Sequence, residues 1–184
     1  ALSTEGRKAF DMFPSETSFL EMASVGDYNL GDYGKVLEIC EKVLEVAPDD
    51  SSRTLRAWST IGDIWHQKGD AKKSYKAYDK ALKINPDYIY VLNNYAYYLS
   101  QEGKKLGKAY AMSKKTIEAE PDNPTYLDTY GWILFLMGKP EEAKPHFKHA
   151  MLYGGKESAV ILDHYAEVPK SIAETIMAGR AKKD

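Results

Sequence analysis

Residues 58–86 read WSTIGDIWHQKGDAKKSYKAYDKALKINP. A large apolar residue, Trp58, opens this stretch, and Pro86 closes it. Between them apolar and small residues recur three and four positions apart, which is the spacing of amphipathic helices, and Gly69 interrupts the pattern where one helix would end. The stretch therefore predicts two antiparallel helices joined by a short turn.

The same pattern recurs along the chain. Four prolines lie 34, 38 and 35 residues apart, at Pro14, Pro48, Pro86 and Pro121. Small residues keep the same register, at Ser24, Gly62, Ala96 and Gly131 in the first helices and at Val36, Ser74, Ala109 and Ala143 in the second helices. A repeat of this length indicates stacked helical hairpins in which small residues allow close approach and large residues fill the space between.

The units match the pattern W-x2-L-G-x2-Y…A-x3-F…P, and the chain resembles the tetratricopeptide repeat (TPR) family over nearly its whole length. The second unit matches best, with Trp58, Gly62 and Tyr78 in register, and the fourth has Gly131 and Phe147. The first matches least well, because Cys40 stands where the pattern has a large aromatic residue. The chain looks most like bacterial TPR proteins of scaffold type.

The resemblance implies an all-α fold, a right-handed superhelix of antiparallel helix pairs. We expect a single solenoid over residues 1–184, made of an unpaired second helix at 3–13, repeats at about 17–50, 55–88, 89–123 and 124–157, and a partial first helix with a capping helix at 158–184. The unpaired helix indicates either a chain that starts inside a longer solenoid or an N-terminal cap. We also expect an extra helical turn after Pro48 and a longer turn near residues 103–105.

Composition and motifs exclude several classes of function. The 184 residues carry 25 basic and 27 acidic side chains, a net charge of −2, which argues against a dedicated nucleic-acid binder although lysines cluster on the predicted second helices. The sequence has no phosphate loop, no HExxH and no CxxC motif, so we predict no enzyme activity and no cofactor. Two histidines one turn apart, His146 and His149, are too few for a zinc site, and Cys40 is predicted to be a buried packing thiol.

The first helix of each TPR hairpin lines the concave surface in this family, so residues there that are not needed for packing are candidates for partner binding. Tyr97 and Trp132 occupy equivalent places where packing does not require an aromatic residue; they either bind a partner or pack against neighbouring residues. By register, the groove candidates are Tyr28, Asp63, His66, Tyr90, Asn93, Asn94, Tyr97, Asp128 and Trp132.

The resemblance also allows one family subtype to be tested. TPR domains that hold the C-terminal carboxylate of chaperone tails use Lys, Asn and Arg side chains, but Glu21, Val25 and Thr60 stand at matching places here. We therefore expect no such clamp. The sequence favours a non-catalytic protein-interaction module that binds a protein or peptide in its groove; the alternative is a structural or assembly segment of a larger multi-repeat protein. Both the cytoplasm and the periplasm are compatible with this sequence, and no apolar run is long enough to span a membrane.

Overall fold

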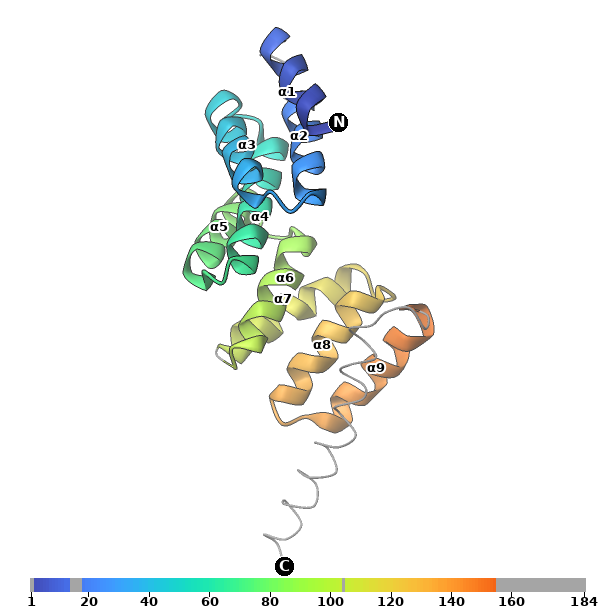
Figure 1. The fold of residues 1–184 in the computed structure, drawn as a ribbon. Coiled ribbons are helices and arrows are strands. Elements are labelled where there is room, and N and C mark those ends of the chain that lie inside the picture. The colour runs from blue at the N-terminus through green and yellow to red at the C-terminus, as the bar shows by residue number, and fades with distance from the viewer. Residues whose placement is uncertain (1, 14–17, 104, 155–184) are drawn as a thin grey trace, which may run out of the picture. The chain divides into compact units, whose positions relative to one another are not determined.

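The computed structural model describes residues 2–13, 18–103 and 105–154, and every regular element within them is an α-helix (Figure 1). The all-α class predicted from the sequence is thereby confirmed. The partial helix and capping helix predicted for residues 158–184 lie outside the described residues. The helices are α1 (Leu2–Met12), α2 (Ser18–Asn29), α3 (Tyr33–Val46), α4 (Ser51–Gln67), α5 (Ala71–Ile84), α6 (Ile89–Gln101), α7 (Leu106–Ala119), α8 (Pro124–Leu136) and α9 (Pro140–Gly154).

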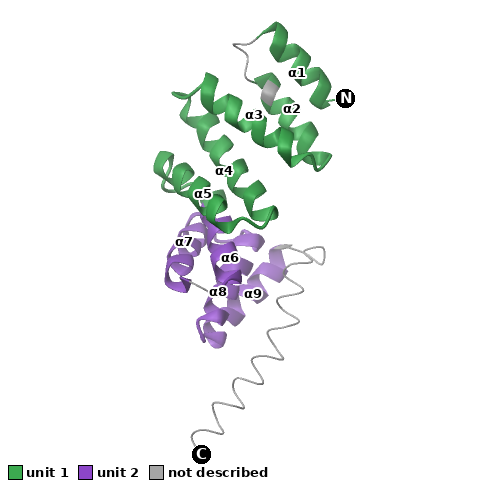
Figure 2. Cartoon of the chain, turned by 60° about the vertical axis from the view of Figure 1, so that its left-hand side comes forward, with its two compact units in different colours: residues 1–91 green, residues 92–184 purple. Residues whose placement is uncertain are grey.

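The chain divides into two compact units, residues 1–91 and residues 92–184 (Figure 2). In the first unit α2 packs against α3, α3 against α4, and α4 against α5, while in the second α7 packs against α8 and α8 against α9. No helix in the described part of the chain is long and apolar enough to cross a membrane.

Glycine and proline punctuate the helices as the sequence predicts. Gly69 and Gly138 follow α4 and α8 with φ angles of 78° and 75°, a left-handed conformation that glycine adopts without a steric cost. Prolines follow each of α3, α5 and α7 by two residues, where they prevent the helix from continuing, at Pro48, Pro86 and Pro121.

Both predicted irregularities in the repeats are present. Helix α4 has 17 residues, whereas α6 and α8 have 13 each, and the additional turn starts at Ser51 with Asp50 as its N-cap. The Asp50 carboxylate accepts a hydrogen bond from the Arg53 backbone N–H at 2.9 Å. The turn between α6 and α7 is one residue longer than the other first-to-second helix turns, and within it Lys105 adopts a left-handed φ of 54°.

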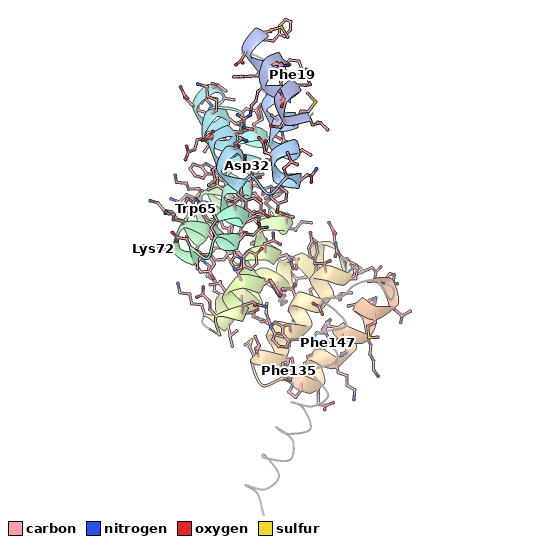
Figure 3. The ribbon with its side chains drawn as sticks, viewed as in Figure 1. Phe19, Asp32, Trp65, Lys72, Phe135 and Phe147 are labelled. Carbon is pink, nitrogen blue, oxygen red and sulfur yellow. The ribbon has the colours of Figure 1, made fainter. Side chains whose placement is uncertain are left out.

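Within each well-matched hairpin, an aromatic ring of the second helix lies against a glycine of the first. The Tyr78 ring of α5 is completely buried against Gly62 of α4, so closely that a Cβ on Gly62 would overlap the ring. In the second unit the buried Phe147 ring of α9, labelled in Figure 3, faces Gly131 of α8, where an added Cβ would lie 3.1 Å from Phe147 Cε1. These contacts set how closely the two helices approach.

Helices α1 and α2 also pack through glycines. A Cβ on Gly6 would lie 2.6 Å from the Phe19 carbonyl oxygen, so α1 approaches the α2 backbone directly. The first unit of the pattern has Asp27 where a larger apolar residue is typical, and the structure explains this exception. Asp27 is buried, and its Oδ2 accepts a hydrogen bond from Arg7 Nη2 of α1 at 2.7 Å. A charge-assisted pair therefore replaces an apolar contact at this helix interface.

Replacing Gly62 with alanine should destabilise the protein more than the same change at Gly131. Overpacking costs about 1–3 kcal/mol, whereas alanine gains about 1 kcal/mol over glycine in a helix interior. At Gly62 the ring cannot withdraw easily, because the Tyr78 hydroxyl donates a hydrogen bond to Asp63. At Gly131 a shift of a few tenths of an ångström suffices, so the two terms should nearly cancel. Urea unfolding followed by far-UV circular dichroism measures both variants, and equal losses would contradict this account.

Candidate functional site

A groove runs between the two helices α2 and α4 of the first unit, and two cavities form it. The first, which we call the apolar pocket, has a volume of about 210 Å³. The second, the polar pocket, has a volume of about 310 Å³. Ser24, Val25 and Thr60 line both pockets, so the pockets are adjacent and together form one continuous surface, the α2–α4 groove.

The floor of the apolar pocket comes from α3. Ile39, Cys40 and Val43 are each nearly buried in the core of the first unit, and Ala57 of α4 and Val25 of α2 complete the apolar lining. Val25 is 57% exposed, so its side chain presents apolar surface to solvent. The pocket therefore offers an apolar surface that is open to solvent.

The first repeat lacks the aromatic–glycine pair that lies between the two helices of the second and fourth repeats. Cys40 stands in the register position of Tyr78 and Phe147, and Ser24 stands in that of Gly62 and Gly131. Ser113 of α7 occupies the same position in the third repeat but is fully buried. In the first repeat, the side chains around Cys40 leave a pocket open above the small thiol. In the third repeat, the neighbouring side chains cover Ser113 completely.

Charged side chains surround the mouth of the apolar pocket. Arg53 and Arg56, one turn apart on α4, and Glu21 on α2 all line it. Glu21 Oε1 lies 3.0 Å from Arg56 Nη2 and 3.4 Å from Arg53 Nε. One carboxylate oxygen therefore bridges two guanidinium groups across the groove.

The polar pocket brings together three residues that the sequence proposes as groove candidates: Tyr28, Asp63 and Tyr90. The Tyr90 hydroxyl donates a hydrogen bond to Asp63 Oδ2 at 2.9 Å, and the Tyr78 hydroxyl donates to Asp63 Oδ1. The Tyr28 hydroxyl accepts a hydrogen bond from Gln67 Nε2 at 3.0 Å. Hydroxyl and carboxylate oxygens thus line this cavity, and tyrosines contribute partly exposed rings beside them.

The other candidates lie outside these two cavities. His66 of α4 is half-buried. In the second unit Asn93 and Asp128 are buried, in contrast to the exposed positions that the repeat register predicts for them, and Asn94 is half-buried. The Asn93 Oδ1 atom is buried and accepts no hydrogen bond from the described residues.

The two aromatic candidates of the second unit make packing contacts. Trp132 stacks on Phe135 with 5.6 Å between ring centroids, and both pack against the core cluster that contains Tyr130, Leu134 and Phe147. Tyr97 is half-buried with its ring 5.7 Å from that of Tyr98. Burial, and to a lesser extent the charge of Asp128, raises the pKa of Tyr97. These contacts account for both side chains within their own unit.

Sequence reasoning did not identify the apolar pocket or the role of Arg53. One signal was present, because Cys40 departs from the aromatic pattern at a position that packs between helices. Arg53 lies in the extra turn of α4, outside the repeat register, so no aligned position in another repeat points to it. Among the described residues, no group of three or more His, Cys, Asp or Glu side chains could hold a metal ion.

The comparisons with known proteins agree with this architecture. Sequence models of the tetratricopeptide repeat match residues 55–88 and 77–111. A TPR repeat-containing protein of Pseudomonas aeruginosa, PA4667, is 25% identical over 117 residues, which are 64% of this chain and 19% of that relative. This chain therefore spans about a fifth of the length of that relative.

Solved structures show the same fold at low sequence identity. The MamA crystal structure superposes with a TM-score of 0.68 at 17% identity, covering 85% of this chain and 88% of MamA. YrrB, described as a TPR protein with an unusual peptide-binding site, superposes with a TM-score of 0.65 at 15% identity, covering 88% of this chain and 80% of YrrB. The fold is that of a helical-hairpin solenoid. Together with this fold, the matches to residues 55–88 and 77–111 support a protein of the tetratricopeptide repeat type.

Alkylation of Cys40, the only cysteine of the chain, should be slow in the folded protein. Burial raises the pKa of the Cys40 thiol to about 12 from an ordinary value near 9.0. Because the thiolate is the reactive form, we expect iodoacetamide at pH 8 to react at least about thirtyfold more slowly with native than with urea-unfolded protein. Between pH 7 and pH 10 the native rate should rise without levelling, whereas the unfolded rate should begin to level near pH 9. Equal rates would show that Cys40 is not buried as described.

Proposed function

We propose that this chain is a non-catalytic protein-interaction module and that the α2–α4 groove binds an extended peptide segment of a partner protein. The observation that carries the proposal is the open apolar pocket with Cys40 at its floor, directly beside a polar pocket lined by Tyr28, Asp63 and Tyr90. An apolar cavity next to fixed hydrogen-bonding groups suits a peptide, because one side chain can enter the cavity while the polar groups hold its backbone.

The size of the apolar pocket suits one side chain. A cavity of about 150 Å³ lined by apolar residues is large enough for a benzene ring, and this pocket has a volume of about 210 Å³. A phenylalanine or a branched aliphatic residue of the partner therefore fits. YrrB, which has the same fold, carries a peptide-binding site, and this supports the choice of a peptide as the ligand.

The second unit contributes candidates that stay predictions from the repeat register. We propose that Asn94, Tyr97 and Trp132, together with the buried Asn93 and Asp128, form a separate candidate binding surface on the second unit. Their packing contacts and burial make them secondary to the α2–α4 groove. His66 is likewise retained only as a prediction.

The exposed lysines of α5 favour a protein partner over a nucleic acid. Lys73 Nζ lies 3.7 Å from the centroid of the Trp65 ring, and Lys80 Nζ lies 3.7 Å from that of Trp58. Cation–π contacts of this kind hold the lysines against their own hairpin. Lys72, by contrast, extends away from the helices (Figure 3), but the net charge of the whole chain is −2.

A second candidate function is an assembly segment within a longer protein. The observation that supports this alternative is that the match covers only 19% of the length of the Pseudomonas aeruginosa relative. In that case the groove would hold no separate peptide, and the activity would lie in other parts of the protein.

Replacing Cys40 with phenylalanine should fill the apolar pocket and block peptide binding. The probe is a peptide selected from a random phage-displayed library against the full 184-residue chain, then synthesised with a fluorescent label. We expect Cys40→Phe to weaken its binding at least about tenfold, because the added ring occupies the site of the ligand side chain. Fluorescence anisotropy measures the affinity.

The matched control is Cys40→Ala, which also removes the thiol but leaves the pocket open and should keep the affinity within about twofold. Circular dichroism must show unchanged helix content in both variants. If selected peptides bind Cys40→Phe as tightly as the original chain, the α2–α4 groove is not the binding site. If the library yields no binding peptide, the assembly alternative is favoured.

A further inference from the structure

The mouth of the apolar pocket holds two positive charges and one negative charge. Arg53 and Arg56 project from α4, and Glu21 faces them from α2. Asp50 also binds Arg53, with its Oδ2 2.6 Å from Arg53 Nη1, but Asp50 caps α4 and does not line the pocket. A ligand that enters the pocket therefore meets a pair of guanidinium groups whose only counter-charge within the pocket lining is Glu21.

The ion pairs between Glu21 and the two arginines are partly exposed, so another carboxylate can take the place of Glu21. The side chains of Glu21 and Arg56 are 39% and 52% exposed. Exposed ion pairs of this type contribute little to stability, because water screens them and both long side chains lose freedom. A competing carboxylate held nearby by other contacts can therefore replace Glu21.

Glu21 also leaves part of the donor capacity of the arginines unused. Arg56 donates one hydrogen bond to Glu21 Oε1 and one to Ser52 Oγ, each at 3.0 Å. Arg53 Nε lies 3.4 Å from Glu21 Oε1 but makes no hydrogen bond within the described residues. A guanidinium group has five N–H donors arranged to bind a carboxylate through two parallel bonds. The arrangement around Glu21 falls short of that geometry.

We propose that the α2–α4 groove selects a partner segment in which an aspartate or glutamate lies two residues from the apolar residue that enters the pocket, and that Glu21 occupies the arginine pair until the partner's carboxylate displaces it. This inference rests on the proposed function. It adds the chemical class of the ligand and a competing contact built into the groove.

The spacing of two residues follows from the geometry of an extended chain. Successive side chains of an extended segment point to opposite sides, so residues two apart face the same surface, about 6.6 Å from one another. The pocket and the arginines are parts of one surface, so the apolar and acidic residues of the ligand must share a face. An acidic side chain and a C-terminal carboxylate present the same pair of oxygens to the arginines, and peptide libraries with blocked and with free C-termini distinguish the two.

An oriented peptide library tests the proposal. Ten-residue peptides with phenylalanine fixed at position 5, all other positions degenerate and both termini blocked are passed over the immobilised full chain. Retained peptides are sequenced by mass spectrometry. We expect aspartate and glutamate to be enriched at position 3 or position 7. A second library that ends in phenylalanine with a free carboxylate should show weaker retention.

Three variants separate the roles of the charged residues. Glu21→Gln removes the competing carboxylate and should increase retention of the acidic peptides about two- to fivefold, which corresponds to the strength of an exposed ion pair. Arg56→Gln should abolish the acidic enrichment. Glu45→Gln is the matched control, because Glu45 makes a similar exposed pair with Lys42 at 3.0 Å, on α3 and outside the lining of both pockets, and it should change nothing.

The possible failures are distinguishable. Suppose that the chain retains peptides, that Cys40→Phe blocks this retention, and that aspartate and glutamate are not enriched at position 3 or position 7. The inference is then wrong and the proposed function stands. If Glu21→Gln fails to increase retention of acidic peptides, the competing role of Glu21 is wrong. Enrichment confined to the library with a free carboxylate would assign the arginine pair to a chain terminus instead. If no peptide is retained by the original chain, the proposed function itself fails.

Discussion

An aromatic ring on the second helix of a hairpin needs a glycine on the first, and this constraint underlies the rest of the structure. Tyr78 is completely buried against Gly62, and Phe147 is buried against Gly131. Because glycine has no side chain, the two helices approach until the ring fills the gap, which gives dense packing with few residues. The same contact fixes neighbouring polar groups, since the Tyr78 hydroxyl donates a hydrogen bond to Asp63 at the edge of the groove.

The first repeat departs from this constraint, and its departure produces the candidate site. Cys40 and Ser24 replace the ring and the glycine, so the space between helices remains open instead of filled. Arg53 borders that space because α4 is one turn longer than the first helices of the later repeats, whereas Arg56 lies within the part of α4 that all repeats share. The position that an aromatic ring fills in other hairpins is therefore open for a partner side chain at Cys40. This is consistent with a scaffold whose repeats are similar but not equivalent.

Two buried carboxylates, Asp27 and Asp63, are stabilised by hydrogen bonds that the repeat pattern does not predict. Asp27 occupies an apolar position and is compensated by Arg7 of α1, a helix that precedes the repeat containing Asp27. Asp63 is held by tyrosine hydroxyls from α5 and α6. In the sequence, Asp27 replaces a larger apolar residue, whereas Asp63 is one of the groove candidates. Their partners come from other helices and could be identified only once those helices were placed.

The sequence by itself determined the all-α class, the glycine turn after α4, the extra turn of α4 and the packing position of Tyr78, because each follows from periodicity along one or two neighbouring helices. It also placed Tyr28, Asp63 and Tyr90 among nine groove candidates, but did not single them out from the other six. The tertiary structure alone decided that Asn93 and Asp128 are buried, that Trp132 stacks on Phe135, and that a pocket opens above Cys40. The repeat register determines on which face of a helix a residue lies. How far its side chain is buried depends on the side chains of the neighbouring helices, which the register does not specify.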